Sequence, residues 1–152
     1  MEARRKAMKV KVLICNCKGL CPSFKDADIN TLPFHLESEM DIQYSVLHPM
    51  LCGQGGNIVL TELLREAASD HDTYIVSAAC APKVQDKLFK KVLRKAGFDE
   101  KRFVPVDVRG TDNEGITKRL KERVEALALE LRKSDRPSRI AARGAAPAMS
   151  QP

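Results

Sequence analysis

Tryptophan is absent from this 152-residue sequence, and only 5% of its residues are aromatic. Stacking platforms for single-stranded nucleic acid are therefore scarce. The chain nevertheless carries a formal net charge of +6, with basic residues gathered near both ends and along residues 87–95. We interpret this excess as a solvated helix face with basic tails, suited to an acidic protein partner, and we do not expect specific nucleic-acid binding.

Long hydrophobic runs are missing too. No apolar run approaches the roughly 20 residues that span a bilayer, so we expect no membrane span. The basic start of the chain is followed by only about five consecutive apolar residues, fewer than the roughly 7–15 of a signal-peptide core. We therefore expect a cytoplasmic protein, in which clustered cysteines more often bind metal or do redox work than form disulfides.

Common nucleotide-binding and catalytic motifs are not found. The stretch GQGG at residues 53–56 has neither the Rossmann glycine spacing nor the Gly-Lys-Ser/Thr ending of a P-loop, and it follows the second predicted strand, not the first. We also find no acid/base pair and no nucleophile–base constellation. The chain alone is therefore not expected to be a catalyst.

Apolar runs alternate with helical patterns through residues 9–134. Strands are predicted over residues 10–14, 42–47, 74–79 and 103–108, the last with Pro105 at an edge position or a bulge. Helical periodicity follows over residues 57–69, 83–97 and 113–131, whereas residues 26–40, interrupted by Pro33, predict a short helix or an irregular crossover. This alternation predicts a small doubly wound (Rossmann- or flavodoxin-like) α/β domain with a parallel sheet of about four strands.

The periodic patterns also divide the chain. We expect a basic N-terminal arm over residues 1–8, one α/β domain over residues 9–134, and a disordered basic tail or linker over residues 135–152, where Ala, Pro, Arg and Ser dominate.

Cysteines fall where the predicted strands end. Cys15 and Cys17 follow the first strand, Cys52 follows the second and Cys80 follows the third. Since the carboxyl ends of parallel strands share one edge of the sheet, these four cysteines are expected to converge there, beside helix N-termini that favour anions. The N–H groups of Gly53, Gly55 and Gly56 are candidates to hydrogen-bond the bound group.

Four convergent thiolates suit either tetrahedral zinc or an iron–sulfur cluster, and their spacing favours neither. A further possibility lies in the CNCKGLC stretch at residues 15–21, which could be a thiol–disulfide exchange site with Lys18 lowering a thiol pKa. In that case Cys52 and Cys80 would have no role.

Three stretches together resemble the N-terminal domain of the A-type iron–sulfur subunit of heterodisulfide reductase. They are VLICNC (residues 12–17), LCGQGGNI (51–58) and VSAACAPKVQDKLFKKVLRKAG (76–97). That family shows a strand ending in Cys-His-Cys-Gly, a later Cys-Ser-x-x-Gly-Gln, and Ala-Ala-Cys-Ser-Pro before a helix containing Leu-Phe. The resemblance covers about residues 9–112 and favours iron–sulfur over zinc.

The resemblance implies one [4Fe–4S] cluster ligated by Cys15, Cys17, Cys52 and Cys80, in an electron-transfer module without flavin of its own. It also implies partners that are other oxidoreductase subunits, with flavin or ferredoxin-like electron donors and acceptors.

The sequence departs from the family pattern at several positions. Asn16 replaces the His, Lys18 the Gly, and Ala81 the Ser, while Val84-Gln85-Asp86 stands where the helix usually has a His. Cys21 has no counterpart in the pattern and is a possible alternative ligand.

Three further residues near the predicted site are expected to be structural. His48 is expected to be a loop residue and not a ligand. Asp107 and Arg109 are expected to form a surface ion pair, although Arg109 could also hydrogen-bond near the cluster.

Overall fold

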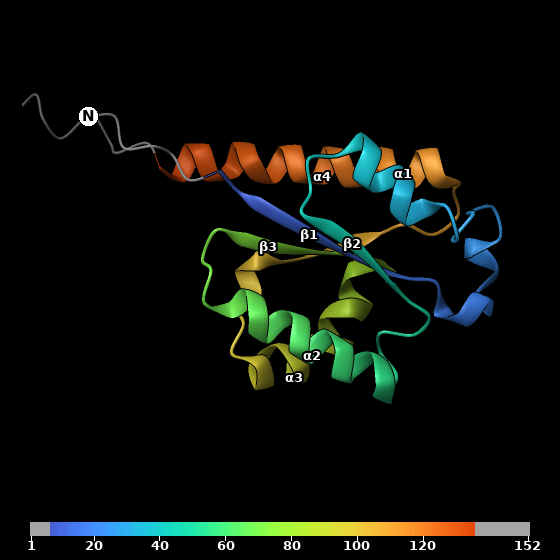
Figure 1. The fold of residues 1–152 in the computed structure, drawn as a ribbon, viewed down its shortest axis with the longest axis horizontal. Helices are drawn as coiled ribbons and strands as arrows, with labels where there is room; N and C mark the ends of the chain where they lie inside the picture. The colour runs from blue at the N-terminus through green and yellow to red at the C-terminus, as the bar shows by residue number, and fades with distance from the viewer. Residues whose placement is uncertain (1–6, 136–152) are drawn as a thin grey trace, which may run out of the picture.

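Four parallel strands form one sheet at the centre of the computed structural model, which describes residues 7–135 (Figure 1). Their order across the sheet is β2-β1-β3-β4, and every neighbouring pair is parallel. The strands are β1 (Lys9–Cys15), β2 (Tyr44–His48), β3 (Thr73–Ala79) and β4 (Phe103–Asp107).

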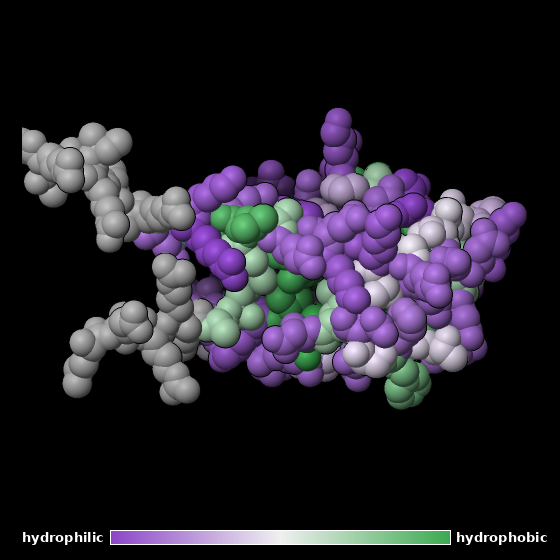
Figure 2. Space-filling view, turned by 90° about the horizontal axis from the view of Figure 1, so that it is seen from above, coloured by the Kyte–Doolittle hydropathy of each residue, from purple (hydrophilic) through white to green (hydrophobic). Residues whose placement is uncertain are grey.

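Helices cover both faces of the sheet. On one face lie α1 (Leu32–Glu39) and α4 (Asn113–Ser134), and on the other lie α2 (Gln54–Ala68) and α3 (Pro82–Ala96) (Figure 1). Short 3-10 turns occupy Cys17–Gly19, Pro22–Phe24 and Glu100–Arg102. Seen from the side of α1 and α4, most of the surface is hydrophilic, with hydrophobic atoms showing mainly in a central hollow (Figure 2). The prediction of a doubly wound α/β fold is confirmed.

The core has two layers because alternate side chains of each strand point to opposite faces. Val12 and Val76 pack with Leu36 and Leu120 under α1 and α4. On the other face, another set packs under α2 and α3: Leu13, Ile75, Leu64, Phe89 and Phe103. Strands buried on both faces explain why β1 and β3 have nearly continuous apolar sequences.

Two elements begin two or more residues away from their expected starts. The second strand begins at Tyr44 and not at residue 42, because the chain is still turning there and the Ile42 N–H donates to the Met40 carbonyl. The helix after it begins at Gln54, three residues early, with Gly53 as its N-cap. Pro105 lies in β4 at the edge of the sheet, as predicted, where a missing N–H costs no ladder hydrogen bond.

No helix within residues 7–135 is long and apolar enough to cross a membrane. The predicted arm and tail lie almost wholly outside the described residues.

Arg102 is a buried cation that ties three elements together. Arg102 is only 5% exposed. Its guanidinium donates hydrogen bonds of 2.7–3.3 Å to the carbonyl oxygens of Ala67, Ala68, Asp70 and Thr73. The guanidinium also stacks on Phe98, 4.5 Å from the ring centroid. A positive charge at the carboxyl end of α2 satisfies carbonyls that the helix leaves unpaired.

We predict that Arg102→Met lowers the free energy of unfolding by about 3 kcal/mol, because four buried carbonyls lose a charged donor. Urea denaturation measures the change. The neighbouring exposed substitution Lys101→Met is the control and should stay within about 0.5 kcal/mol. Equal effects of the two substitutions would show that the Arg102 network is not a stabilising element.

Candidate functional site

The candidate site lies at the topological switch point of the sheet, where the connections that follow two neighbouring strands go to opposite faces. β1 and β3 are neighbours, yet β1 leads to α1 on one face and β3 leads to α3 on the other. The loops that follow these two strands therefore diverge and leave a crevice at the carboxyl edge of the sheet, which is where ligands bind in open α/β sheets.

All five cysteines line a single cavity in this crevice, hereafter the thiol cavity. It measures about 100 Å³, and its walls include Cys15, Cys17, Cys21, Cys52 and Cys80. The remaining wall is apolar apart from one arginine: Phe24, Ala79, Leu88, Phe89 and Arg109. The structure thus brings together the four cysteines singled out in the sequence, and adds the fifth.

Strand ends and helix caps fix three of these thiols. Cys15 is the last residue of β1, and its sulfur accepts the Leu51 N–H at 3.5 Å. Cys52 directly precedes Gly53, the N-cap of α2, and Cys80 directly precedes Ala81, the N-cap of α3. Two helix N-termini, each with a positive dipole end, therefore begin beside the cavity.

The loop that carries Cys17 has an uncommon backbone. Cys17 and Lys18 both have positive φ, +54° and +55°, in the left-handed region that glycine favours. The Lys18 N–H holds this turn by donating to the Pro49 carbonyl at 2.6 Å. The related family pattern has Gly at position 18, where it would adopt this conformation without strain.

Cys21, named in the sequence as a possible alternative ligand, lines the cavity from the same loop. A hydrogen bond from the Ser23 side chain, another from its backbone, and the charge of Arg109 lower the pKa of the Cys21 thiol. Burial raises the pKa of Cys52, and the nearby thiols of Cys15 and Cys17 raise it further. The pKa of Cys80 is likewise raised, chiefly by burial.

Arg109 is both an ion-pair residue and part of the cavity wall. Its Nε and Nη2 donate to the two carboxylate oxygens of Asp107 at 3.0 and 2.9 Å, so the expected ion pair is present. The pair lowers the pKa of the Asp107 carboxyl. The Arg119 Nη1 in turn donates to the Asp107 and Arg109 carbonyls at 3.2 and 2.8 Å. Arg109 is thereby held as the one charged side chain facing the thiols.

Gln85 anchors the Cys80 loop, a role that the sequence did not reveal. It is fully buried, and its Nε2 donates to the carbonyls of Cys80 at 2.6 Å and Val106 at 3.2 Å. Gln85 lies in the segment where the related family usually has His. A polar residue on the apolar face of α3 was the one sequence signal of this role. His48 ends β2 and its Nδ1 accepts the Met50 N–H at 3.1 Å, and it does not line the thiol cavity.

The three candidate glycines differ in what the structure demands of them. A Cβ on Gly56 would lie 2.0 Å from the Met50 carbonyl oxygen and 2.5 Å from the Leu51 Cα, so the loop packs directly on the helix there. A Cβ on Gly55 would meet nothing within 4 Å. Gly53 is intermediate, with the Met50 sulfur 3.1 Å away. Gly55 and Gly56 belong to the first turn of α2 and not to the preceding loop.

We predict that Gly56→Ala lowers stability by about 2 kcal/mol or more, because the new methyl must displace the backbone that carries Cys52. Gly55→Ala is the matched control in the same turn and should be neutral or add up to about 1 kcal/mol of helix propensity. Urea denaturation measures stability, and the alkylation rate of Cys52 reports movement of the loop. Equal behaviour of both variants would contradict the close approach.

A single metal ion has a stringent spacing requirement, since Zn–S bonds are only about 2.3 Å long. Among residues 7–135, no three His, Cys, Asp or Glu side chains form a group that could hold one ion. The five thiols surround a space of about 100 Å³.

Comparison with known proteins gives one distant relative. The chain is 23% identical over 103 residues to an A-type iron–sulfur subunit, numbered 1, of the CoB–CoM heterodisulfide reductase of Methanopyrus kandleri. The match covers 67% of this chain and only 14% of the relative. No family model matches the sequence. The relative is an iron–sulfur protein by name, which agrees with the resemblance found in the sequence.

Proposed function

We propose that this chain binds one [4Fe–4S] cluster and relays electrons within a heterodisulfide-reductase-like oxidoreductase assembly. The observation that carries the proposal is the thiol cavity, where cysteines from three strand ends meet. The named relative supports the same chemistry, although the chain spans a small part of its length. Flavin would be held by other proteins of the assembly, and a cytoplasmic location belongs to the same proposal.

The donor set fits an iron–sulfur cluster. Such clusters are held by Cys thiolates, and all the sulfur-bearing residues at this cavity are cysteines. We assign Cys15, Cys17, Cys52 and Cys80 as ligands, with Cys21 as the alternative on the first loop. When bound, the cluster would supply one-electron redox chemistry.

The chain's other residues would control the surroundings of that group. Phe24, Leu88 and Phe89 would give the group an apolar surrounding on part of the cavity wall, and Arg109 would set a positive charge against it. The N–H groups of Gly55 and Gly56, in the first turn of α2, would favour anionic sulfur, whereas the Gly53 N–H already donates to the Met50 carbonyl at 3.1 Å. Solvent access and local charge are the means by which a protein tunes a cluster's potential.

A second candidate function is thiol–disulfide exchange by the first loop. The lowered pKa of Cys21 favours it, since Cys17 lines the same cavity and a more acidic thiol is the better leaving group. It gives Cys52 and Cys80 no part to play. A zinc-stabilised docking module would use the same thiols, and it is the resemblance in sequence that favours iron–sulfur over zinc.

We predict that anaerobically purified or reconstituted protein absorbs broadly near 400 nm and contains about four iron and four sulfide per chain. Cys15→Ala, Cys17→Ala, Cys52→Ala and Cys80→Ala should each lose or degrade the chromophore, while Cys21→Ala should keep it. Loss of iron in Cys21→Ala but not in Cys17→Ala would reassign the ligand of the first loop. Colourless protein with zinc, or with no metal after reconstitution, would overturn the proposal.

We also predict that Arg109→Gln makes the reduction potential of the loaded protein more negative, because the reduced cluster carries the greater negative charge. The shift should be tens of millivolts. For a one-electron couple, about 59 mV corresponds to a tenfold change in the equilibrium constant, and the charge of a half-exposed side chain is expected to contribute less than 59 mV. A redox titration followed by absorbance or electron paramagnetic resonance measures it. Arg109→Lys keeps the charge and should restore most of the potential, whereas an unchanged potential in Arg109→Gln would remove this role.

A further inference from the structure

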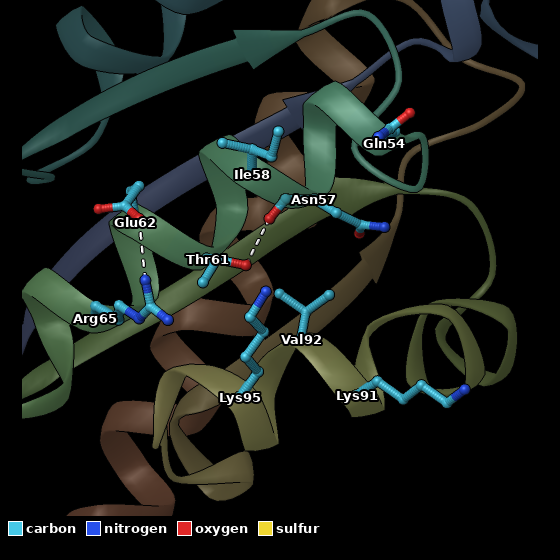
Figure 3. Close-up of a pocket in the computed structure, with 9 residues that line it drawn as sticks. All are labelled: Gln54, Asn57, Ile58, Thr61, Glu62, Arg65, Lys91, Val92 and Lys95. Carbon is cyan, nitrogen blue, oxygen red and sulfur yellow. Dashed lines mark hydrogen bonds and ion pairs between the residues drawn. The ribbon is translucent and has the colours of Figure 1, made fainter.

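A groove separates α2 from α3 on the face of the sheet opposite α4. Its volume is about 620 Å³, and both helices contribute to its walls. Figure 3 shows side chains of the two helices pointing toward one another across it. The residues that matter here are Ile58, Thr61, Arg65, Lys91, Val92 and Lys95.

The groove combines apolar contact area with unpaired positive charge. Val92 forms an apolar part of its lining, and Ile58, 62% exposed, stands at its rim. Lys91 and Lys95 have no ion-pair partner within residues 7–135, and Arg65 pairs only with Glu62 in the preceding turn, at 3.2 Å. Unpaired cations beside the exposed Ile58 side chain are complementary to a surface that offers carboxylates beside an apolar group.

The charge extends over the whole exposed face of α3. This helix of 15 residues carries six lysines and arginines against one aspartate, and all of the cations are exposed. In contrast to a nucleic-acid surface, no aromatic residue lines the groove on which bases could stack. The chemistry therefore favours an acidic protein.

The groove adjoins the thiol cavity. Leu88 lines that cavity and is 43% exposed. Leu88, Lys91 and Lys95 are exposed and follow the i, i+3, i+7 spacing of a single face of α3, so a stripe of one apolar and two basic side chains runs from the cavity to the groove. A protein seated in the groove would approach the thiols closely.

We propose that the α2–α3 groove is the docking surface for the protein that exchanges electrons with the thiol cavity, and that this partner presents carboxylates around an apolar patch. The inference rests on the proposed function for the role of the partner. The groove and its charge do not depend on which group the thiols hold.

The test uses a small acidic ferredoxin as the probe and the full chain, with its iron and sulfide content measured first. In the double variant Lys91→Glu/Lys95→Glu, the rate of electron exchange with the reduced probe at low ionic strength should fall about 10-fold or more. The control Lys118→Glu/Lys133→Glu makes the same change of charge on α4 and should fall by less than about 2-fold. Salt should diminish the difference, since exposed charges are screened.

Amide chemical-shift mapping with the oxidised probe gives a second readout that needs no cluster in the chain. Shifts confined to α2 and α3 support the groove. Equal slowing in both variants, shifts on α4, or no binding of the acidic probe would overturn the proposal, as would tighter binding of a single-stranded oligonucleotide than of the ferredoxin. A chain without iron but with shifts on α2 and α3 would refute the proposed function and leave the groove standing.

Discussion

The parallel direction of the four strands is the constraint from which the candidate site follows. Because every strand runs the same way, every strand-to-helix loop emerges at one edge. The order β2-β1-β3-β4 then sends the loops after β1 and β3 to opposite faces, which opens a crevice between them. The strand topology alone therefore brings together cysteines as far apart in sequence as Cys15 and Cys80, which line the same cavity.

Burial and charge act against each other in this crevice. Burial raises the pKa of Cys52 and of Cys80, which favours their protonated thiols. A metal group bound there would have to displace those protons, so its binding would be coupled to pH. Arg109 and the beginnings of α2 and α3 would offset the resulting negative charge, and the Asp107 carboxylate keeps the arginine in place.

Sequence periodicity was sufficient to predict the four strands, the helices on both faces and the edge position of Pro105, because burial on two faces leaves a clear hydrophobic pattern. It could not reveal Arg102 or Gln85. Each of these is a polar residue that can be buried only because distant elements supply carbonyl acceptors. For Arg102, Ala67 and Thr73 are two of the residues that supply them. The start of α2 was missed since its glycines have low helix propensity, which the packing of Gly56 on the Met50–Leu51 backbone overrides.

The first loop differs in kind from the other contributors to the thiol cavity. Cys15, Cys52 and Cys80 are held by a strand end or by the residue that caps a helix, so their positions are set by the sheet itself. Cys17 and Cys21 are carried by a loop whose left-handed residues include Lys18, a conformation maintained by short-range backbone hydrogen bonds within the loop and by one from the Lys18 N–H to the Pro49 carbonyl. A loop of this kind can rearrange at a cost of a few kcal/mol, far less than moving a strand. Three thiols are therefore fixed by the fold, and in the proposed cluster site the conformation of the loop would decide which of its two cysteines becomes the fourth ligand.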